Sequence, residues 1–322
     1  MKQSQLRRRI LKGSLSAMTL ASFSALGQQA ARTSIVVPTP PGGPMDFAAR
    51  MLSQELQKRW NKTVIVENKP GAGALIGAEI VGRAAPDGTT LLVHNTSVVA
   101  YPIFVDTKFS ADKDLTPVTN IMQTPYMLFA SNSMPRTLPE IAAYSKANPG
   151  KINIAVIPGT LQQLRTYKLL QAAGITAAMI PYAGTAPVQR ALLADEVQLY
   201  MASPFGMDRF AKDGKLRAIA VLASEPYWVL PEVPTARSQG VNFETSEIYI
   251  LFATAGTPPA VVSKMSSDVA EILKDPAMVA QVRSIGNLAA ATTPEQTARE
   301  LREVTAEALD LARQAGVKRG QQ

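Results

Sequence analysis

The feature that most constrains the fold is an alternation of short apolar runs with segments of helical periodicity. Runs such as 34–37 and 64–66 consist of β-branched and other apolar residues, as buried strands do. Between them lie segments such as 46–60, where apolar residues recur every three or four positions. This pattern predicts an α/β fold with two mixed, mostly parallel sheets and flanking helices. Further strands are predicted at 91–93, 126–131, 152–157, 178–181, 197–201, 216–222 and 249–254.

Two of these runs nearly repeat each other and suggest two lobes. Tyr126–Ser131 resembles Tyr249–Thr254, and a proline-containing helix start follows each. We interpret them as crossover strands, with lobe 2 (131–249) inserted into lobe 1 (33–130 plus 250–318); the alternative is that two apolar strands merely look alike. A length of 322 residues fits two domains, because one core rarely serves so long a chain. The hinge is expected near Ala130–Ser131 and Ala253–Thr254.

Residues 1–27 are expected to form an export signal. They carry five basic residues and no acid, and a modestly apolar stretch of small residues ends in Ala25-x-Gly27, which resembles a cleavage site. Arg7-Arg8-Arg9 and the residues after it match the twin-arginine pattern, while an arginine-rich general secretory signal is the alternative. No later stretch approaches the ~20 apolar residues of a transmembrane helix. We therefore expect a periplasmic protein whose signal peptide is cleaved.

The composition excludes several kinds of chemistry. The absence of Cys excludes disulfides, Cys-ligated zinc, iron–sulfur clusters and thiol nucleophiles. One histidine, His94, rules out a His-rich metal site. The formal charge of +8 falls to +3 without residues 1–27, since 28 Lys and Arg then face 25 Asp and Glu. A charge this small does not indicate a nucleic acid or another polyanion as partner.

Two sequence features could indicate a dinucleotide-binding protein or an enzyme. Gly71–Gly77 follows a strand and opens a helix, as a dinucleotide-binding fingerprint does. Its third glycine comes one position late, and the next strand ends in His94 where a ribose-binding acid is needed. We therefore interpret it as a tight turn with close helix packing, and expect no cofactor and no metal. His94 lies either at a cleft rim or in a structural position; because only His94 could serve a hydroxyl as base, an enzyme is disfavoured.

Four strand-to-helix junctions combine glycine, proline and small hydroxyl residues at an expected helix N-terminus. Free N–H groups and the positive helix end attract a carboxylate there without any charged side chain. One such junction alone could be an ordinary turn, but two in each lobe favour an anion site in a cleft between the lobes. Asp46 is placed to cap the first of these helices. The junctions are Pro41-Gly42-Gly43-Pro44-Met45-Asp46, Asn95-Thr96-Ser97, Pro158-Gly159-Thr160 and Gly184-Thr185-Ala186-Pro187.

Motifs along nearly the whole chain match one known family. They include Pro41-Gly42-Gly43-Pro44-x-Asp46, Val64-Ile65-Val66-Glu67-Asn68-Lys69-Pro70-Gly71, Ala85-Pro86-Asp87-Gly88, Pro181-Tyr182-x-Gly184-Thr185-Ala186-Pro187 and Ala255-Gly256-Thr257-Pro258. From about residue 34 to 316 the chain resembles the periplasmic solute-binding proteins of tripartite tricarboxylate transporters, the Bug family. The resemblance implies a two-lobed periplasmic-binding-protein fold of type II, which closes on a small organic acid held mostly by backbone groups.

The resemblance also implies which residues bind the ligand, and where this chain departs from the family. Ala202-Ser203 stands where many members have Asp followed by Ser, which argues against an amino acid ligand. The loop 156–163 is apolar and carries two glutamines where members often have a Gly/Ser/Asn-rich loop. The first-lobe residues implied are Pro41, Gly42, Gly43, Asn95, Thr96 and Ser97. Those of the second lobe are Gly159, Thr160, Gly184, Thr185, Ala186 and Pro187.

The resemblance therefore predicts a binding protein without catalytic residues. It captures a small organic carboxylate, works as a monomer and delivers its ligand to the membrane permease of a tripartite tricarboxylate transporter. No bond is broken, because the function is a population shift between open and closed lobes. One alternative is a periplasmic sensor that presents a carboxylate to a signalling partner. Another is an enzyme that uses His94.

Overall fold

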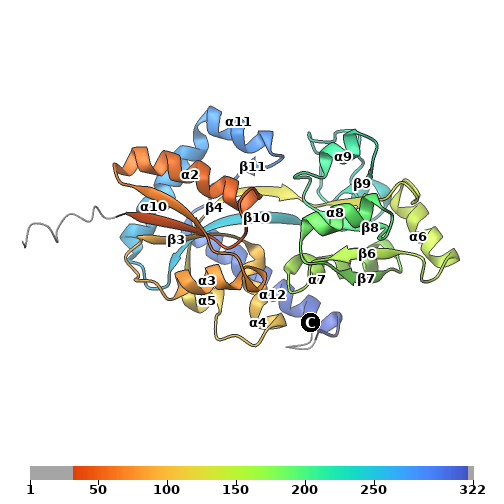
Figure 1. Cartoon of the computed structure of the whole chain (residues 1–322), viewed down its shortest axis with the longest axis horizontal. Coiled ribbons are helices and arrows are strands. Elements are labelled where there is room, and N and C mark those ends of the chain that lie inside the picture. Colours follow the sequence, from red (N-terminus) through yellow and green to blue (C-terminus); the bar gives the residue numbers. More distant parts are fainter. Residues whose placement is uncertain (1–31, 318–322) are drawn as a thin grey trace, which may run out of the picture.

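The computed structural model describes residues 32–317, and it contains two sheets arranged along the long axis of the molecule (Figure 1). The larger sheet has the strand order β11-β4-β10-β3-β1-β2, and the smaller has the order β7-β6-β8-β5-β9. The larger sheet consists of β1 (Thr33–Val37), β2 (Val64–Asn68), β3 (Thr90–Asn95), β4 (Leu115–Pro125), β10 (Ser246–Thr254) and β11 (Leu288–Ala289). The smaller consists of β5 (Met127–Ala130), β6 (Asn153–Val156), β7 (Ala178–Pro181), β8 (Leu199–Ala202) and β9 (Arg217–Val221).

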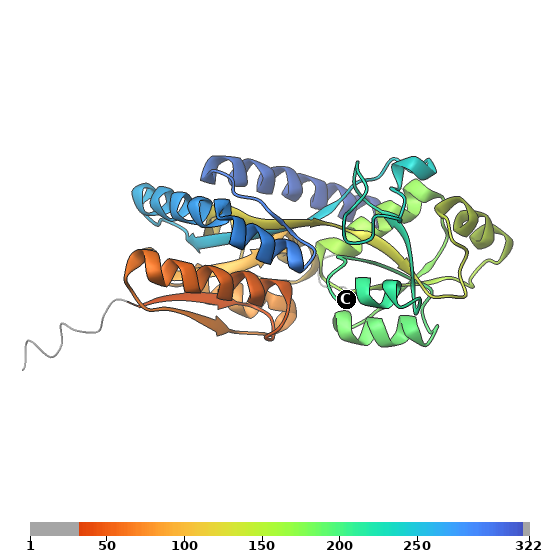
Figure 2. The ribbon, with the colours of Figure 1, turned by 90° about the horizontal axis from the view of Figure 1, so that it is seen from above.

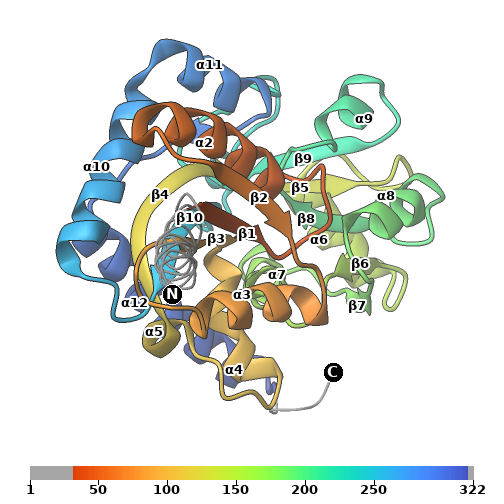
Figure 3. The same cartoon turned by 60° about the vertical axis from the view of Figure 1, so that its left-hand side comes forward.

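Helices cover both faces of the larger sheet, and together they form lobe 1 (Figure 3). One core lies between the sheet and α2 (Pro44–Trp60), α10 (Pro259–Lys274) and α11 (Pro276–Ser284). The opposite face packs on α3 (Leu75–Gly82), α4 (Tyr101–Phe104) and α12 (Pro294–Gln314). The short elements η1 (Ala72–Ala74), η2 (Thr96–Ala100) and α5 (Ala111–Asp114) connect the strands.

The smaller sheet has its own two cores and forms lobe 2. One face packs against α6 (Leu138–Ala147) and α7 (Leu161–Ala173), and the other packs against α8 (Thr185–Leu193). The remaining elements of this lobe are α9 (Asp208–Lys212) and η3 (Arg237–Gln239). Leu161 and Leu164 of α7 extend into the lobe 1 core beside α12, so the lobes also share apolar contacts.

The chain crosses between the lobes twice, at neighbouring positions. β4 continues through Tyr126 directly into β5, and Figure 2 shows this continuous path from one lobe to the other. The return path reaches β10 through Thr245. The Tyr126 N–H donates to the Thr245 carbonyl at 3.0 Å, which joins the two crossings by a backbone hydrogen bond.

These crossings differ from the expected boundaries by four residues at each end. Met127–Ala130 lies in the lobe 2 sheet, where it pairs with β8 and β9. The whole of Ser246–Thr254 lies in the lobe 1 sheet, between β3 and β4. The expected hinge positions Ala130–Ser131 and Ala253–Thr254 therefore lie at the far ends of strands, away from the crossings at Tyr126 and Thr245. The two-lobed α/β fold itself is confirmed.

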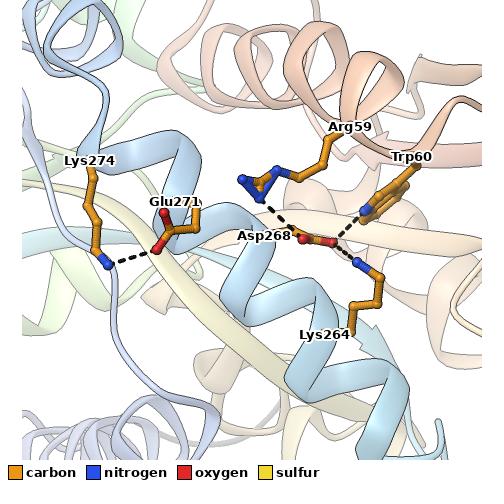
Figure 4. Close-up of polar contacts among 6 residues, drawn as sticks. All are labelled: Arg59, Trp60, Lys264, Asp268, Glu271 and Lys274. Atoms are coloured by element: carbon orange, nitrogen blue, oxygen red, sulfur yellow. Dashed lines mark hydrogen bonds and ion pairs between the residues drawn. The ribbon is translucent and has the colours of Figure 1, made fainter.

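A buried carboxylate of α10 binds two side chains of α2 in lobe 1 (Figure 4). Asp268 of α10 is 7% exposed and accepts a 2.7 Å hydrogen bond from the Trp60 indole N–H. Its other contacts are Lys264 at 2.8 Å and Arg59 at 3.4 Å. Because the Asp268 carboxylate is shielded from water, we expect its bonds to be stronger than those of the exposed Glu271–Lys274 pair on the same helix.

We predict that Asp268→Ala lowers the free energy of unfolding by about 2 kcal/mol, since it leaves the Trp60 N–H without its charged acceptor. Urea unfolding followed by Trp fluorescence measures the change. Lys274→Ala is the control, because it breaks only the exposed pair and should leave the midpoint unchanged. Equal midpoints for wild type and Asp268→Ala would contradict the role assigned to Asp268.

Candidate functional site

The parallel strands of both lobes end at the junction between the lobes. β4 leaves lobe 1 at its carboxyl end, and β1, β2 and β3 run in the same direction. β5 enters lobe 2 antiparallel to β8, so β6, β7 and β8 also end where β5 begins. In open α/β sheets, ligands bind beyond the carboxyl ends of the strands. The four expected junctions follow β1, β3, β6 and β7, and this topology places all four at the same region.

Two of the four junctions are closed by their own side chains. Asn95 ends β3 and caps η2, since its Oδ1 accepts the Ser97 N–H at 3.1 Å. Thr160 caps α7 by accepting from the Gln163 N–H, and the Gly159 N–H donates to Gln163 Oε1 at 3.0 Å. Thr96 and Ser97 are also buried, at 2% and 8% exposure. These backbone groups are already occupied, which weakens the expectation that they bind the ligand directly.

The other two helix N-termini lack a side-chain cap, although the Gly42 N–H before α2 is already occupied by Asp46. Gly43 precedes α2 and Gly184 precedes α8, and neither helix has a side-chain cap. Gly184 has φ = 128°, a conformation that suits glycine, and the first turn of α8 contains no acid. Thr185 and Ala186 are exposed there. The first turn of α8 therefore presents N–H donors and the positive end of the helix dipole without a competing carboxylate.

Asp46 does not cap α2, contrary to the sequence-based expectation. The helix begins at Pro44, so Asp46 lies within its first turn. Its carboxylate accepts from the Gly42 N–H at 3.0 Å, from Arg50 Nε at 2.9 Å and from Asn68 Nδ2 at 3.0 Å. Burial alone would raise the pKa of Asp46, but these hydrogen bonds outweigh it and the pKa is lowered. Asp46 thus fixes the turn that contains Pro41, Gly42 and Gly43.

The glycine-rich segment Gly71–Gly77 forms a tight turn, as expected. It contains η1 and the start of α3. A Cβ on Gly77 would lie 2.7 Å from Pro38 Cβ and 3.1 Å from the Lys69 carbonyl oxygen, so only glycine allows α3 to approach this closely. Gly77 therefore allows close helix packing, as the sequence predicted for this segment.

His94 occupies a structural position. It is 1% exposed, with Nε2 2.8 Å from the Tyr101 hydroxyl and Nδ1 2.9 Å from the Asn95 carbonyl oxygen. Burial lowers its pKa to about 4, although hydrogen bonds with Asn95 act in the opposite direction. A neutral, enclosed imidazole whose two nitrogens both contact protein groups is poorly placed to act on a substrate.

A carboxylate that the sequence analysis overlooked lies at the junction. Glu247 is the second residue of β10, and Tyr249 pairs with Asn95, the last residue of β3. Glu247 therefore lies two residues beyond the carboxyl end of β3. Its Oε1 accepts from Asn95 Nδ2 at 2.6 Å and its Oε2 accepts from the Tyr126 hydroxyl at 2.8 Å. Burial raises the pKa of Glu247, while bonds from Tyr126 and Asn95 and the charge of Arg165 oppose that rise.

Glu247 is close to the second lobe as well as the first. Tyr200 of β8 is 2% exposed, and burial raises its pKa to about 12. A hydrogen bond with Thr185 opposes this rise, while the negative charge of Glu247 adds to it. The Glu247 carboxylate itself is held by Asn95 at the lobe 1 junction and by Tyr126 at the first crossing.

Arg165 connects the lobes beside this carboxylate. It comes from α7 and is 7% exposed. Its guanidinium donates to the Ser246 carbonyl at 2.9 Å and forms a 2.8 Å ion pair with Glu307 of α12. Its Nε has no hydrogen-bond partner within the described part of the chain. Glu307 is therefore the ion-pair partner of Arg165, whose positive charge also acts on Glu247.

One sequence signal could have revealed Glu247. Residues 246–254 alternate strictly, with Tyr249, Leu251 and Ala253 in one core and Ile250 and Phe252 in the other. Glu247 is the one charged residue in this strand. A lone charge at the start of a buried strand indicates a specific partner.

The other candidate sites in the described residues do not point to a function. Among residues 32–317, no group of three or more His, Asp or Glu side chains is arranged to hold a metal ion. A hollow of about 500 Å³ lies in lobe 2, where Arg136, Arg217 and Glu232 contribute to its wall. It lies among the α9 and β9 segments, away from the four junctions. Within the same described range, no helix combines the length and apolar character needed to cross a bilayer.

The fold and the helix ends at the junction define a two-lobed solute-binding protein. Comparison with known proteins identifies the family: the chain belongs to the tripartite tricarboxylate transporter family receptors, whose family model matches residues 48–316. The expected resemblance is thereby confirmed. The chain is 30% identical to BugT of Bordetella pertussis, and the match covers 82% of each protein.

Two solved structures share the fold over nearly their full length. MatC from Rhodopseudomonas palustris with bound malate is 29% identical, with a TM-score of 0.77 over 87% of this chain and 98% of MatC. The periplasmic binding protein BugD is also 29% identical, with a TM-score of 0.77 over 89% of this chain and 98% of BugD.

We predict that His94 makes folding sensitive to mild acid. Its folded pKa of about 4 lies below its usual 6.5, so its stabilising contribution is complete above pH 6.5 and is lost as the pH falls towards 4. Between pH 7 and pH 4, wild type should lose about 3 kcal/mol more than His94→Gln does. Urea unfolding at a series of pH values measures this, and parallel pH curves for the two proteins would contradict it.

Proposed function

We propose that this protein is a periplasmic receptor that captures a small organic carboxylate between its lobes and delivers it to the permease of a tripartite tricarboxylate transporter. The observation that carries the proposal is the open N-terminus of α8 at the carboxyl edge of lobe 2, opposite that of α2 in lobe 1. Backbone N–H groups at such an end bind a carboxylate without any basic side chain. Malate bound to MatC supports an organic acid as the ligand class.

The junction residues have separate roles in this proposal. The exposed first turn of α8, with Gly184, Thr185, Ala186 and Pro187, binds the ligand carboxylate, and the turn of Pro41, Gly42 and Gly43 completes the grip from lobe 1. Asn95, Ser97, Gly159 and Thr160 hold the shape of the site through their internal hydrogen bonds, and Thr96 is buried beside them. No catalytic residue is required, because capture and release are changes in population between lobe positions.

Export to the periplasm belongs to the same proposal. The expected signal, residues 1–27, lies outside the described residues. The name of BugD as a periplasmic binding protein supports this location. A twin-arginine or general secretory signal would serve equally, since both deliver the chain across the membrane.

A thermal-shift screen of the chain without residues 1–27 tests the ligand class. We expect at least one mono-, di- or tricarboxylate to raise the melting temperature, since a ligand at a hundredfold excess over its Kd stabilises the folded state by about 2.7 kcal/mol. Neutral analogues, such as the corresponding amides, serve as controls and should give no shift. A screen in which no organic acid gives a shift would refute the proposal.

A second prediction locates the carboxylate. Ala186→Pro removes one N–H from the first turn of α8, where proline is compatible with helix geometry. Loss of one charge-assisted hydrogen bond should weaken binding of the acid found in the screen roughly tenfold or more. Ala186→Ser keeps the N–H and should bind as wild type does in calorimetry. If Ala186→Pro binds with unchanged affinity, the carboxylate lies elsewhere.

A further inference from the structure

The lobes are joined by side chains of α7 as well as by the two chain crossings. Arg165 of α7, in lobe 2, donates to the Ser246 carbonyl at 2.9 Å and forms a 2.8 Å ion pair with Glu307 of α12, in lobe 1. The Tyr167 hydroxyl of α7 donates to the Gln314 carbonyl at the end of α12, at 3.0 Å. We call these bonds the α7–α12 contact.

The α7–α12 contact and the uncapped helix N-termini lie on opposite sides of the crossings. Figure 2 shows α12 and α7 along one side of the molecule and α2 and α8 along the other, with the β4–β5 path between them. Figure 1 shows the same arrangement from a second direction, with α7 and α12 below α8 and α2. The side of the molecule where we place the ligand carboxylate is therefore not the side where the helices of the two lobes bond to each other.

A rotation of the lobes about the crossings moves these two sides in opposite directions. Within residues 32–317 the chain passes between the lobes only at Tyr126 and at Thr245, which share a backbone hydrogen bond. The axis of a rigid-body rotation therefore lies at or near these two residues. A rotation that carries α8 towards α2 carries α7 away from α12. A hydrogen bond is lost once its heavy atoms separate beyond about 3.5 Å, so a small rotation is enough to break the contact.

The surroundings of the contact allow it to break and form again. The Glu307 side chain is 30% exposed, Tyr167 is half-buried and Gln314 is exposed, so water can replace their bonds when the helices separate. Arg165 is 7% exposed, and its Nε has no hydrogen-bond partner among the described residues. The contact therefore leaves a buried donor unsatisfied even when it is made, which keeps its net contribution moderate.

We propose that the α7–α12 contact stabilises the open position of the lobes, so that closure on a ligand breaks it and its strength helps to set the affinity of the receptor. This inference rests on the proposed function, because it assumes that capture carries α8 towards α2. A protein whose binding-competent position is rarely populated binds its ligand with reduced apparent affinity. Weakening the contact should therefore tighten binding, although the altered residues lie away from the ligand.

Affinity measurements on a weakened contact test the proposal. In the chain without residues 1–27, Tyr167→Phe removes the hydroxyl donor and Glu307→Gln removes the ion pair with Arg165. Calorimetry with malate, succinate, citrate and benzoate should show that the double variant binds each acid that wild type binds about fivefold more tightly or better. Tyr167→Phe alone should change affinity in the same direction by about twofold, and it serves as the second variant if the double variant does not fold.

A covalent tether tests the opposite direction. The chain contains no cysteine, so Tyr167→Cys and Gln314→Cys place two unique thiols at the ends of one bond of the contact. Joining them with a reducible bis-maleimide should weaken binding of the same acid tenfold or more, because α7 can no longer leave α12. Reduction of the linker should restore the affinity measured before cross-linking. A contact that merely served as a fixed pivot would leave the affinity unchanged by the tether.

Arg313→Ala is the matched control. It breaks the exposed pair of Arg313 with Asp310, 3.2 Å apart, which lies on α12 and does not reach lobe 2. It should bind as wild type does, and melting temperatures without ligand show that each variant is folded.

The outcomes separate this inference from the proposed function. Unchanged or weaker binding by the double variant, or a tether without effect on affinity, overturns the role of the α7–α12 contact and leaves the carboxylate receptor standing. Absence of binding by every acid, here and in the carboxylate screen, overturns both.

Discussion

The structure depends on one continuous chain segment, β4–Tyr126–β5, whose first part belongs to one sheet and whose second part belongs to the other. β4 leaves lobe 1 at the edge where β1, β2 and β3 also end, and β5 enters lobe 2 antiparallel to β8. The carboxyl ends of both sets of strands are therefore directed to the same junction. The backbone bond between Tyr126 and Thr245 keeps the two crossings together. Loops distant in the sequence gather there as a consequence of topology alone.

Local hydrogen bonding then distinguishes loops that look similar in sequence. Asn95, Gln163 and Asp46 occupy N–H groups of their own turns, whereas no side chain caps the N-terminus of α8. A side-chain cap satisfies the same donors that an anion would use. Closed junctions consequently act as rigid walls, while open ones keep donors for a ligand. The site is therefore rigid where its helix ends are capped, and it offers N–H donors where they are not.

Most strands and the family could be predicted from the sequence, because apolar runs and short family motifs are local signals. β4 was missed because Pro117 and Pro125 resemble strand breakers. Pro117 lies next to a register irregularity opposite Phe252, and Pro125 ends the strand, so neither costs a regular ladder bond. The contact of Asn68 with Asp46 and those of Asn95 and Tyr126 with Glu247 join residues far apart in the sequence, so no local pattern reveals them.

The charged side chains of the junction are largely neutralised within the protein. Arg165 is neutralised by Glu307, and Asp46 is paired with Arg50, so these groups offer little net charge to a ligand. The α8 terminus provides partial positive charge through backbone groups, which any carboxylate satisfies equally. Discrimination is a difference between two affinities, and a uniform grip contributes nothing to that difference. It must arise from groups that meet the remainder of the ligand.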